Sequence, residues 1–140
     1  MKLEIGGLRK VFINNKRGNL LVLDDVALKV VSGEFVSIVG PSGCGKTTLI
    51  EIIAGLQQKT SGEIFIDRVP IGKSPSNRAI VFQQYALFPW LTVRKNIEYG
   101  LKVRRINKKE RRDISRKYID MVGLNGFEKY YPHELSGGMQ

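Results

Sequence analysis

A glycine-rich run at residues 40–48 carries the residue types needed to hold a row of phosphates. The run reads Gly40-Pro41-Ser42-Gly43-Cys44-Gly45-Lys46-Thr47-Thr48. Small residues let backbone N–H groups converge on one anion, and a helix that begins near Lys46 would add the positive end of its dipole. The Lys46 ammonium is placed to reach the β- and γ-phosphates, and the Thr47 hydroxyl to coordinate Mg²⁺. The run therefore predicts a binding site for a nucleoside triphosphate with Mg²⁺.

The residues on either side of this loop predict a strand before it and a helix after it. Residues 35–39 form an apolar stretch, interrupted only by Ser37, that predicts a buried strand. After the loop, apolar residues recur at the spacing of one helix face: Leu49, Ile52, Ile53 and Leu56. Gly55 suits the end of this helix, because glycine readily adopts the left-handed conformation of a C-cap.

Length and composition favour one ordinary globular domain. The 140 residues are 42% apolar and 26% charged, which permits a hydrophobic core. No apolar run reaches the roughly 18 to 20 residues of a membrane-spanning helix, and the first residues lack a secretory signal. The only cysteine, Cys44, excludes an internal disulfide and is expected to be a small loop residue rather than a nucleophile. We therefore expect a cytosolic protein.

The net charge of +10 is concentrated between residues 102 and 117. Apolar residues recur there and just beyond at helical spacing: Ile114, Tyr118, Met121 and Val122. This spacing predicts an amphipathic helix whose basic side chains lie opposite an apolar stripe. A solvated helix face is the first interpretation of the charge, and contact with a membrane, a protein partner or nucleic acid remains open.

The remaining pattern is β-rich in the first half of the chain and helical in the second. We expect strands at 3–12, 20–30, 63–67 and 79–82, separated by the polar loop 14–19, turns at Ser32-Gly33 and Ser61-Gly62, and a loop containing Pro70, Gly72, Ser74 and Pro75. Helices are expected after Thr92 and Asn107, which are suitable N-caps, with Glu110 completing a capping box.

Phosphoryl transfer also requires a carboxylate near Mg²⁺ and a group that orients water. Asp67 ends a strand, but the short apolar run before it and Arg68 after it favour an exposed carboxylate. Gln83 directly follows the strand predicted at 79–82 and is placed to contact a metal-bound water. The apolar segment 84–91 is broken by Pro89 and must pack either on a partner protein or in the core of the helical segment.

The C-terminal run Leu135-Ser136-Gly137-Gly138-Met139-Gln140, together with the loop at 40–48 and Gln83, resembles the ATP-binding cassette (ABC) ATPases. The resemblance covers essentially the whole chain. It implies an α/β P-loop NTPase of ABC type, here one incomplete domain over 1–140. Its expected parts are a mainly antiparallel β subdomain (1–34 and 60–78), a partial RecA-like P-loop core (35–59 and 79–83), and a Q-loop with a helical subdomain (84–140).

The resemblance also implies a role for each motif. All residues from Gly40 to Thr48 would bind ATP, with Lys46 and Gln83 in catalysis, Thr47 and Gln83 at Mg²⁺, and Phe12 stacked on adenine. Residues Leu135 to Gln140 resemble the ABC signature, whose serine and glycine backbone groups bind the γ-phosphate of ATP held by the opposite subunit. Four side chains after Gln83 would contact a transmembrane partner: Tyr85, Leu87, Phe88 and Trp90.

The implied function is that of the ATP-binding, energy-coupling subunit of an ABC transporter. Residues 82–93 are similar to importers of nitrate, sulfonate, taurine or bicarbonate, which implies import of a small anion. The implied partners are a transmembrane permease, a second ATPase subunit in a homodimer and, indirectly, a solute-binding protein. The implied location is cytoplasmic, on the inner face of the cell membrane.

The family's later motifs lie outside these 140 residues. In the family, an apolar strand ending in Asp-Glu and a switch histidine follow the signature, whereas His133 precedes it and is expected at the surface. We therefore expect the 140-residue chain alone to bind ATP weakly without hydrolysing it. Two alternatives remain open: a soluble ABC ATPase that acts on nucleic acid or the ribosome, and a non-catalytic ATP-binding remnant.

Overall fold

The computed structural model describes residues 2–14, 18–72 and 78–140. The chain divides into two units, Met1–Ile80 and Val81–Gln140, and each is considered by itself. The predicted loop residues 15–17 and the predicted turn residues Ser74 and Pro75 lie outside the described residues.

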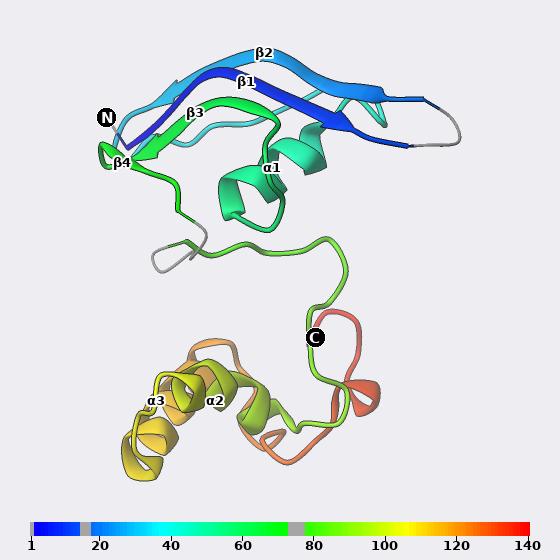
Figure 1. Ribbon diagram of the computed structural model, residues 1–140. Helices are drawn as coiled ribbons and strands as arrows, with labels where there is room; N and C mark the ends of the chain where they lie inside the picture. Colours follow the sequence, from blue (N-terminus) through cyan, green and yellow to red (C-terminus); the bar gives the residue numbers. More distant parts are fainter. Residues whose placement is uncertain (1, 15–17, 73–77) are drawn as a thin grey trace. The chain divides into compact units, whose positions relative to one another are not determined.

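The first unit is an antiparallel sheet with one helix against it (Figure 1). Its strands are β1 (Leu3–Phe12), β2 (Leu20–Val30), β3 (Ser61–Ile66) and β4 (Val69–Pro70), in the order β2-β1-β3-β4. All three neighbouring pairs are antiparallel. The predicted strands at 3–12 and 20–30 are confirmed, the strand predicted at 63–67 begins at Ser61, and Ser32-Gly33 forms the expected turn.

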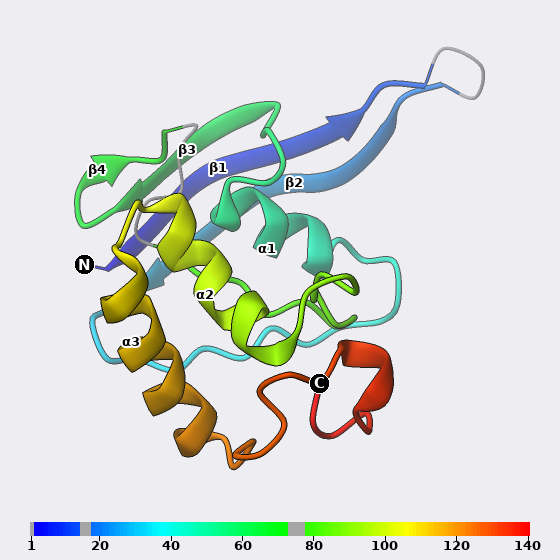
Figure 2. The same ribbon diagram turned by 90° about the horizontal axis from the view of Figure 1, so that it is seen from below.

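Helix α1 (Lys46–Ala54) covers the sheet and completes the core of the first unit, as Figure 2 also shows. Leu49 and Ile52 of the helix pack with strand residues in one buried cluster: Ile5, Leu8, Leu23 and Ile64. Gly55 ends the helix in the left-handed conformation, with φ of 79°, as predicted. Leu56 lies beyond this cap and is 53% exposed, so the predicted apolar stripe is shorter than expected.

The two buried strands predicted at 35–39 and 79–82 are not formed, and these predictions are wrong for this structure. Phe35 is 93% exposed, Val39 is 86% exposed and Val81 is 95% exposed. A strand persists only where a neighbouring strand pairs with its N–H and C=O groups. No segment of the described chain pairs with either stretch. Their apolar side chains therefore stay at the surface, except for the half-buried Ile38 and Ile80.

The second unit contains α2 (Val93–Val103), α3 (Lys108–Met121) and a short 3₁₀ turn, η1 (Pro132–Glu134). Thr92 Oγ1 accepts from the Lys95 N–H at 3.5 Å, and Asn107 Oδ1 accepts from the Glu110 N–H at 3.0 Å. Both predicted N-caps are thus confirmed. The capping box differs in one detail, since Glu110 accepts from the side-chain amide of Asn107. Within the described residues, no helix has the length and apolarity needed to cross a bilayer.

The face that α3 buries differs from the predicted stripe. Ser115 and Ile119 are its buried residues, whereas Tyr118, Met121 and Val122 are between 50% and 66% exposed. Ile119 packs with Val93 and Leu135 in the core of the second unit. The apolar pattern predicted the wrong face of α3, because the polar side chain of Ser115 occupies an inward-facing position.

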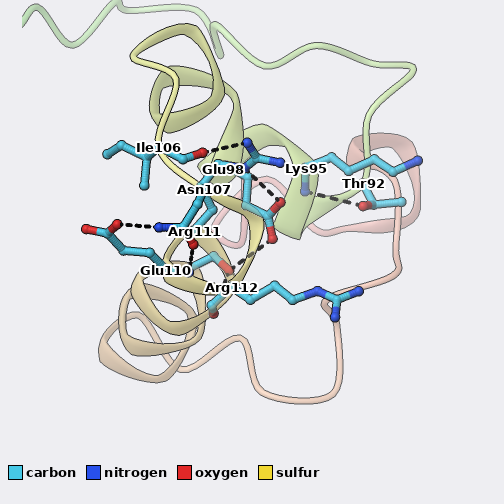
Figure 3. Close-up of polar contacts among 9 residues, drawn as sticks. Thr92, Lys95, Glu98, Ile106, Asn107, Glu110, Arg111 and Arg112 are labelled. Atoms are coloured by element: carbon cyan, nitrogen blue, oxygen red, sulfur yellow. Dashed lines mark hydrogen bonds and ion pairs between the residues drawn. The ribbon is translucent and has the colours of Figure 1, made fainter.

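Polar contacts hold α3 against α2 at this position, as Figure 3 shows. The Ser115 hydroxyl lies 3.3 Å from Glu98 Oε1 and 3.0 Å from the Arg112 carbonyl oxygen, so it can donate to either acceptor. Arg111 Nε lies 3.9 Å from Glu98 Oε2, and both of these side chains are largely buried. Arg111 also donates to the Ile106 carbonyl at 2.8 Å. Glu98 is therefore the acceptor that fixes the inward-facing side of α3.

Candidate functional site

The loop at 40–45 leads directly into α1 and leaves a row of backbone donors unused. Gly45 is the N-cap of α1 in a left-handed conformation, with φ of 97° and no side-chain cap. The N–H groups of Ser42, Gly43 and 45–48 donate to no oxygen of the described residues. A helix N-terminus with free N–H groups attracts an anion through both the hydrogen bonds and the helix dipole. The backbone of this loop therefore fits a phosphate chain.

Lys46 folds back across the same loop. Its Nζ donates to the carbonyl oxygens of Gly40 at 2.8 Å and Pro41 at 2.7 Å, and lies 3.7 Å from Cys44 Sγ. The ammonium group thus braces the curve of the loop that carries the free N–H groups. A phosphate bound to these N–H groups would be attracted by the Lys46 ammonium.

Two glycines make this geometry possible for different reasons. A Cβ on Gly45 would lie 2.9 Å from Leu23 Cδ2 and 3.0 Å from the Val22 carbonyl, so the loop packs directly on β2. Gly43 also has a positive φ, of 80°, but its Cβ would point into open space. Gly45 therefore matters for packing, whereas Gly43 matters for loop conformation and for room above the loop.

Thr47 is the side chain in the first unit best suited to a cation beside the phosphates. It is exposed, and its hydroxyl makes no hydrogen bond with the described part of the chain. No cluster of three or more His, Cys, Asp or Glu that could hold a metal occurs among the described residues. Asp67 lies in the β3–β4 turn with φ of 50°, and its carboxylate pairs with Lys2 Nζ at 2.6 Å. Thr47 thus fits Mg²⁺ only as one ligand beside phosphate oxygens and water.

Phe12 ends β1 and is 36% exposed. Lys10 Nζ lies 4.6 Å from the centre of its ring, a cation–π arrangement. An exposed ring of this kind can stack on a flat heterocycle. Cys44 and His133 are both exposed, and His133 stacks on Tyr131 with ring centres 5.8 Å apart.

Gln83 and the apolar loop after it belong to the second unit. Gln83 is exposed, as are Tyr85 at 61% and Trp90 at 70%. The centre of the Phe88 ring lies 5.7 Å from the ring centre of Trp90 and 4.4 Å from that of Tyr99. Leu87 is half-buried. Trp90 and Tyr85 are therefore not part of this unit's core.

Asn96 on α2 fixes this loop, and the sequence analysis did not identify it. Its Oδ1 accepts from the Phe88 N–H at 2.9 Å. Its Nδ2 lies within hydrogen-bonding distance of three carbonyl oxygens, those of Phe88, Leu91 and Thr92. An asparagine one turn after the Thr92 N-cap was the available signal, since a short amide can pair with nearby backbone.

The residues of the signature-like run form a turn that presents backbone donors. Leu135 is buried, and Gln140 Nε2 donates to the Pro132 and Leu135 carbonyl oxygens at 2.7 and 3.2 Å. Met139 N–H closes the turn on the Ser136 carbonyl at 2.9 Å. The N–H groups of Ser136, Gly137 and Gly138 have no acceptor in the described chain, and all three residues are exposed. This turn can offer three donors to an anion.

Residues 23–140 match the ABC transporter family, and the chain belongs to this family. The chain is 49% identical to the uncharacterized ABC transporter ATP-binding protein MJ0412 of Methanocaldococcus jannaschii. It is 48% identical to the nitrate import ATP-binding protein NrtD of Synechocystis sp. and 42% identical to the aliphatic sulfonates import ATP-binding protein SsuB of Bacillus cereus. These matches cover 99–100% of this chain but only 52–54% of the relatives, so the chain spans about half their length.

Solved structures agree with this assignment. The dimeric structure of MJ0796, a bacterial ABC transporter cassette, superposes with a TM-score of 0.82 at 32% identity. A post-hydrolysis state of the same cassette, bound to ADP and Pi, gives 0.78 at 30% identity. Each match covers 98% of this chain and 64% of the other. The predicted family and the predicted fold class, an incomplete P-loop NTPase of ABC type, are both confirmed.

Proposed function

We propose that this protein is the ATP-binding, energy-coupling subunit of an ABC importer for a small anion. The observation that carries the proposal is the loop and the first turn of α1, where six N–H groups donate to no described residue and the Lys46 ammonium lies on the carbonyl oxygens of the loop. The import of an anion is supported by similarity to import proteins for nitrate and aliphatic sulfonates. Another relative, at 45% identity, is an Fe(3+) ions import ATP-binding protein.

In this proposal each motif acts on one part of Mg²⁺-bound ATP. The N–H groups of Ser42, Gly43 and 45–48 and the Lys46 ammonium hold the phosphates, and the Thr47 hydroxyl is one ligand of Mg²⁺. Phe12 stacks on the base. Gln83 would help to hold Mg²⁺ and to orient a water beside the γ-phosphate, where the metal would supply positive charge. The free N–H groups of 136–138 bind the γ-phosphate of ATP held by a second copy of the subunit.

The proposed partners follow from this arrangement. A transmembrane permease contacts the loop that Asn96 fixes, through Tyr85, Leu87, Phe88 and Trp90. A second copy supplies the opposite half of each ATP site, and a solute-binding protein acts indirectly through the permease. In this proposal the subunit lies on the cytoplasmic face of the membrane. The division into a β subdomain, a P-loop core and a helical subdomain is part of the same proposal.

We further infer that the 140 residues taken alone bind ATP without hydrolysing it. Asp67 is held by Lys2, and the described residues offer no cluster of acids for Mg²⁺. Hydrolysis would then depend on groups outside these residues. Turnover of ATP by this 140-residue chain that disappears in Lys46→Ala would contradict the inference.

Co-purification from detergent-solubilised membranes tests the proposed function. The tagged full-length protein should retain a polytopic membrane protein in the presence of ATP, and Trp90→Ala should reduce this recovery. Met121→Ala is the matched control, because Met121 is equally exposed at 66% but lies outside the loop. Recovery of ribosomes or nucleic acid in a salt-sensitive manner, with no membrane protein, would favour a soluble ABC ATPase instead.

A further inference from the structure

The basic helix α3 contributes two arginines to a small polar pocket in the second unit. The pocket has a volume of about 300 Å³ and is lined by Arg94, Arg112, Ser115, Arg116 and Glu128. Arg94 comes from the first turn of α2, whereas Arg112 and Arg116 lie one turn apart on α3. Three arginines from two helices therefore line one cavity, far along the sequence from the phosphate loop.

The three arginine side chains lie outside the polar contacts that join α2 and α3. None of the three side chains forms an ion pair or hydrogen bond with another described residue. The cation that does brace the two helices is the neighbouring Arg111, through Glu98 and the Ile106 carbonyl. In Figure 3 the Arg112 side chain extends with no contact drawn at its guanidinium end. Among the described residues, the side-chain donors of these three arginines have no hydrogen-bond acceptor.

Glu128 is the one acid that lines the pocket. Hydrogen bonds from its own N–H and from that of Gly126 lower the pKa of Glu128, and the charges of Arg94 and Lys129 lower it further. The Glu128 carbonyl accepts from the Arg94 N–H at 3.1 Å, which fixes this loop at the start of α2. Glu128 remains ionised at neutral pH and offsets one of the three positive charges. A net positive charge is left in the cavity.

We propose that this pocket binds a phosphate group through Arg94, Arg112 and Arg116. A guanidinium presents a planar pair of donors that matches two oxygens of a phosphate. A phosphate monoester has three terminal oxygens in a tetrahedral arrangement and can accept from three arginines, whereas a planar carboxylate offers only two oxygens. The buried Ser115 hydroxyl can donate to Glu98 within the protein. Ser115 therefore forms the base of the pocket and is not a donor to the phosphate.

Binding of inorganic phosphate to the full chain tests this site. All measurements use a Lys46→Ala background, so that any residual binding at the phosphate loop is common to every sample. Arg112→Gln with Arg116→Gln should weaken phosphate binding at least fivefold at constant ionic strength. The matched control, Lys109→Gln with Lys117→Gln, makes the same charge change on the same helix outside the pocket and should stay within twofold of the parent. Equal losses in both pairs, or no loss in either, would overturn the proposal.

Two further measurements separate folding effects and the source of the phosphate. The thermal unfolding midpoints of the variants should agree within a few degrees. If the Arg112→Gln, Arg116→Gln protein unfolds at a lower temperature, Arg112→Lys with Arg116→Lys replaces it. The lysine variant should fold normally and still bind phosphate more weakly than the parent. Sedimentation with phosphatidylcholine vesicles, with and without phosphatidic acid, then identifies the source. Sedimentation that requires phosphatidic acid and is reduced by free phosphate indicates a lipid headgroup. Phosphate binding without sedimentation indicates a free phosphorylated ligand. Tighter binding of polyglutamate than of phosphate, with the same variant pattern, would indicate an acidic protein and overturn the proposal.

Discussion

Asn96 and Phe88 exchange hydrogen bonds in both directions, with the Phe88 N–H donating to Asn96 Oδ1 at 2.9 Å and Asn96 Nδ2 lying 3.2 Å from the Phe88 carbonyl oxygen. The same amide nitrogen lies 2.9 Å from the Leu91 carbonyl. One helical side chain therefore holds the loop that follows Gln83 in a single conformation. This loop presents Trp90 at the surface, so its conformation decides what a partner can contact.

Asn96→Ala should loosen this loop and destabilise the second unit. The substitution leaves the half-buried Phe88 N–H without its acceptor, for an expected loss of about 1–3 kcal/mol. Urea unfolding followed by Trp90 fluorescence measures the change. Asn125→Ala is the control, because Asn125 donates only to the exposed side chain of Asp120. Equal stability of the two variants would show that Asn96 does not fix the loop.

Trp90→Ala should separate partner binding from nucleotide binding. The ring is 70% exposed, and its removal leaves the contact between Phe88 and Tyr99 intact. We expect weaker association with the permease and an unchanged affinity for ATP. Loss of ATP binding together with permease binding would mean that Trp90 stabilises the fold instead.

Gly43→Ala and Gly45→Ala should have different effects although both positions have positive φ. The added methyl group at Gly45 meets Leu23 and the Val22 carbonyl, so thermal unfolding should shift clearly downward. At Gly43 the methyl group meets nothing, and the folding cost should be limited to roughly 1–2 kcal/mol of backbone strain. Gly43→Ala should nonetheless weaken ATP binding, because its methyl group enters the space above the loop. A larger loss of stability at Gly43 than at Gly45 would contradict the packing described for the loop.

Gly62→Ala should be the most damaging glycine substitution in the sheet. Gly62 has φ of 90°, and a Cβ there would overlap the Gly7 carbonyl of β1 at the irregular pairing between β1 and β3. We expect loss of several kcal/mol or failure to fold. Gly72→Ala, where a Cβ meets nothing and φ is ordinary, is the control and should change stability little. Similar midpoints for the two variants in thermal unfolding would rule out this close approach.

Local signals in the sequence predicted the parts of the fold that depend on local chemistry. Thr92 and Asn107 cap α2 and α3, and Gly55 ends α1, because each cap is satisfied by residues within one turn. Strands at 35–39 and 79–82 would need pairing strands from far along the chain. Apolar character alone does not provide such partners. The apolar residues themselves were correctly recognised, but the pairing that would bury them is not a local property.

The candidate site shows the same division. The run 40–48 was recognisable because its spacing encodes a local turn and helix start, and the free N–H groups follow from that geometry. Tertiary packing brings Asn96 against the loop that contains Phe88. It also brings Arg94 to the same pocket as the arginines of α3. Ser115 was overlooked for the same reason, since a serine buried against Glu98 interrupts the apolar stripe of α3.

The affinity of the full chain for Mg²⁺-ATP, with and without the Lys46 ammonium, tests the central claim most directly. Equilibrium dialysis should show binding that Lys46→Ala weakens at least about tenfold, which corresponds to the loss of one charge-assisted contact of roughly 1.4 kcal/mol or more. Lys29→Ala, which removes the same charge from an exposed position on β2, should leave the affinity unchanged. Equal affinities of the Lys46→Ala and Lys29→Ala proteins, with both folded, would contradict the assignment of this loop as the ATP site.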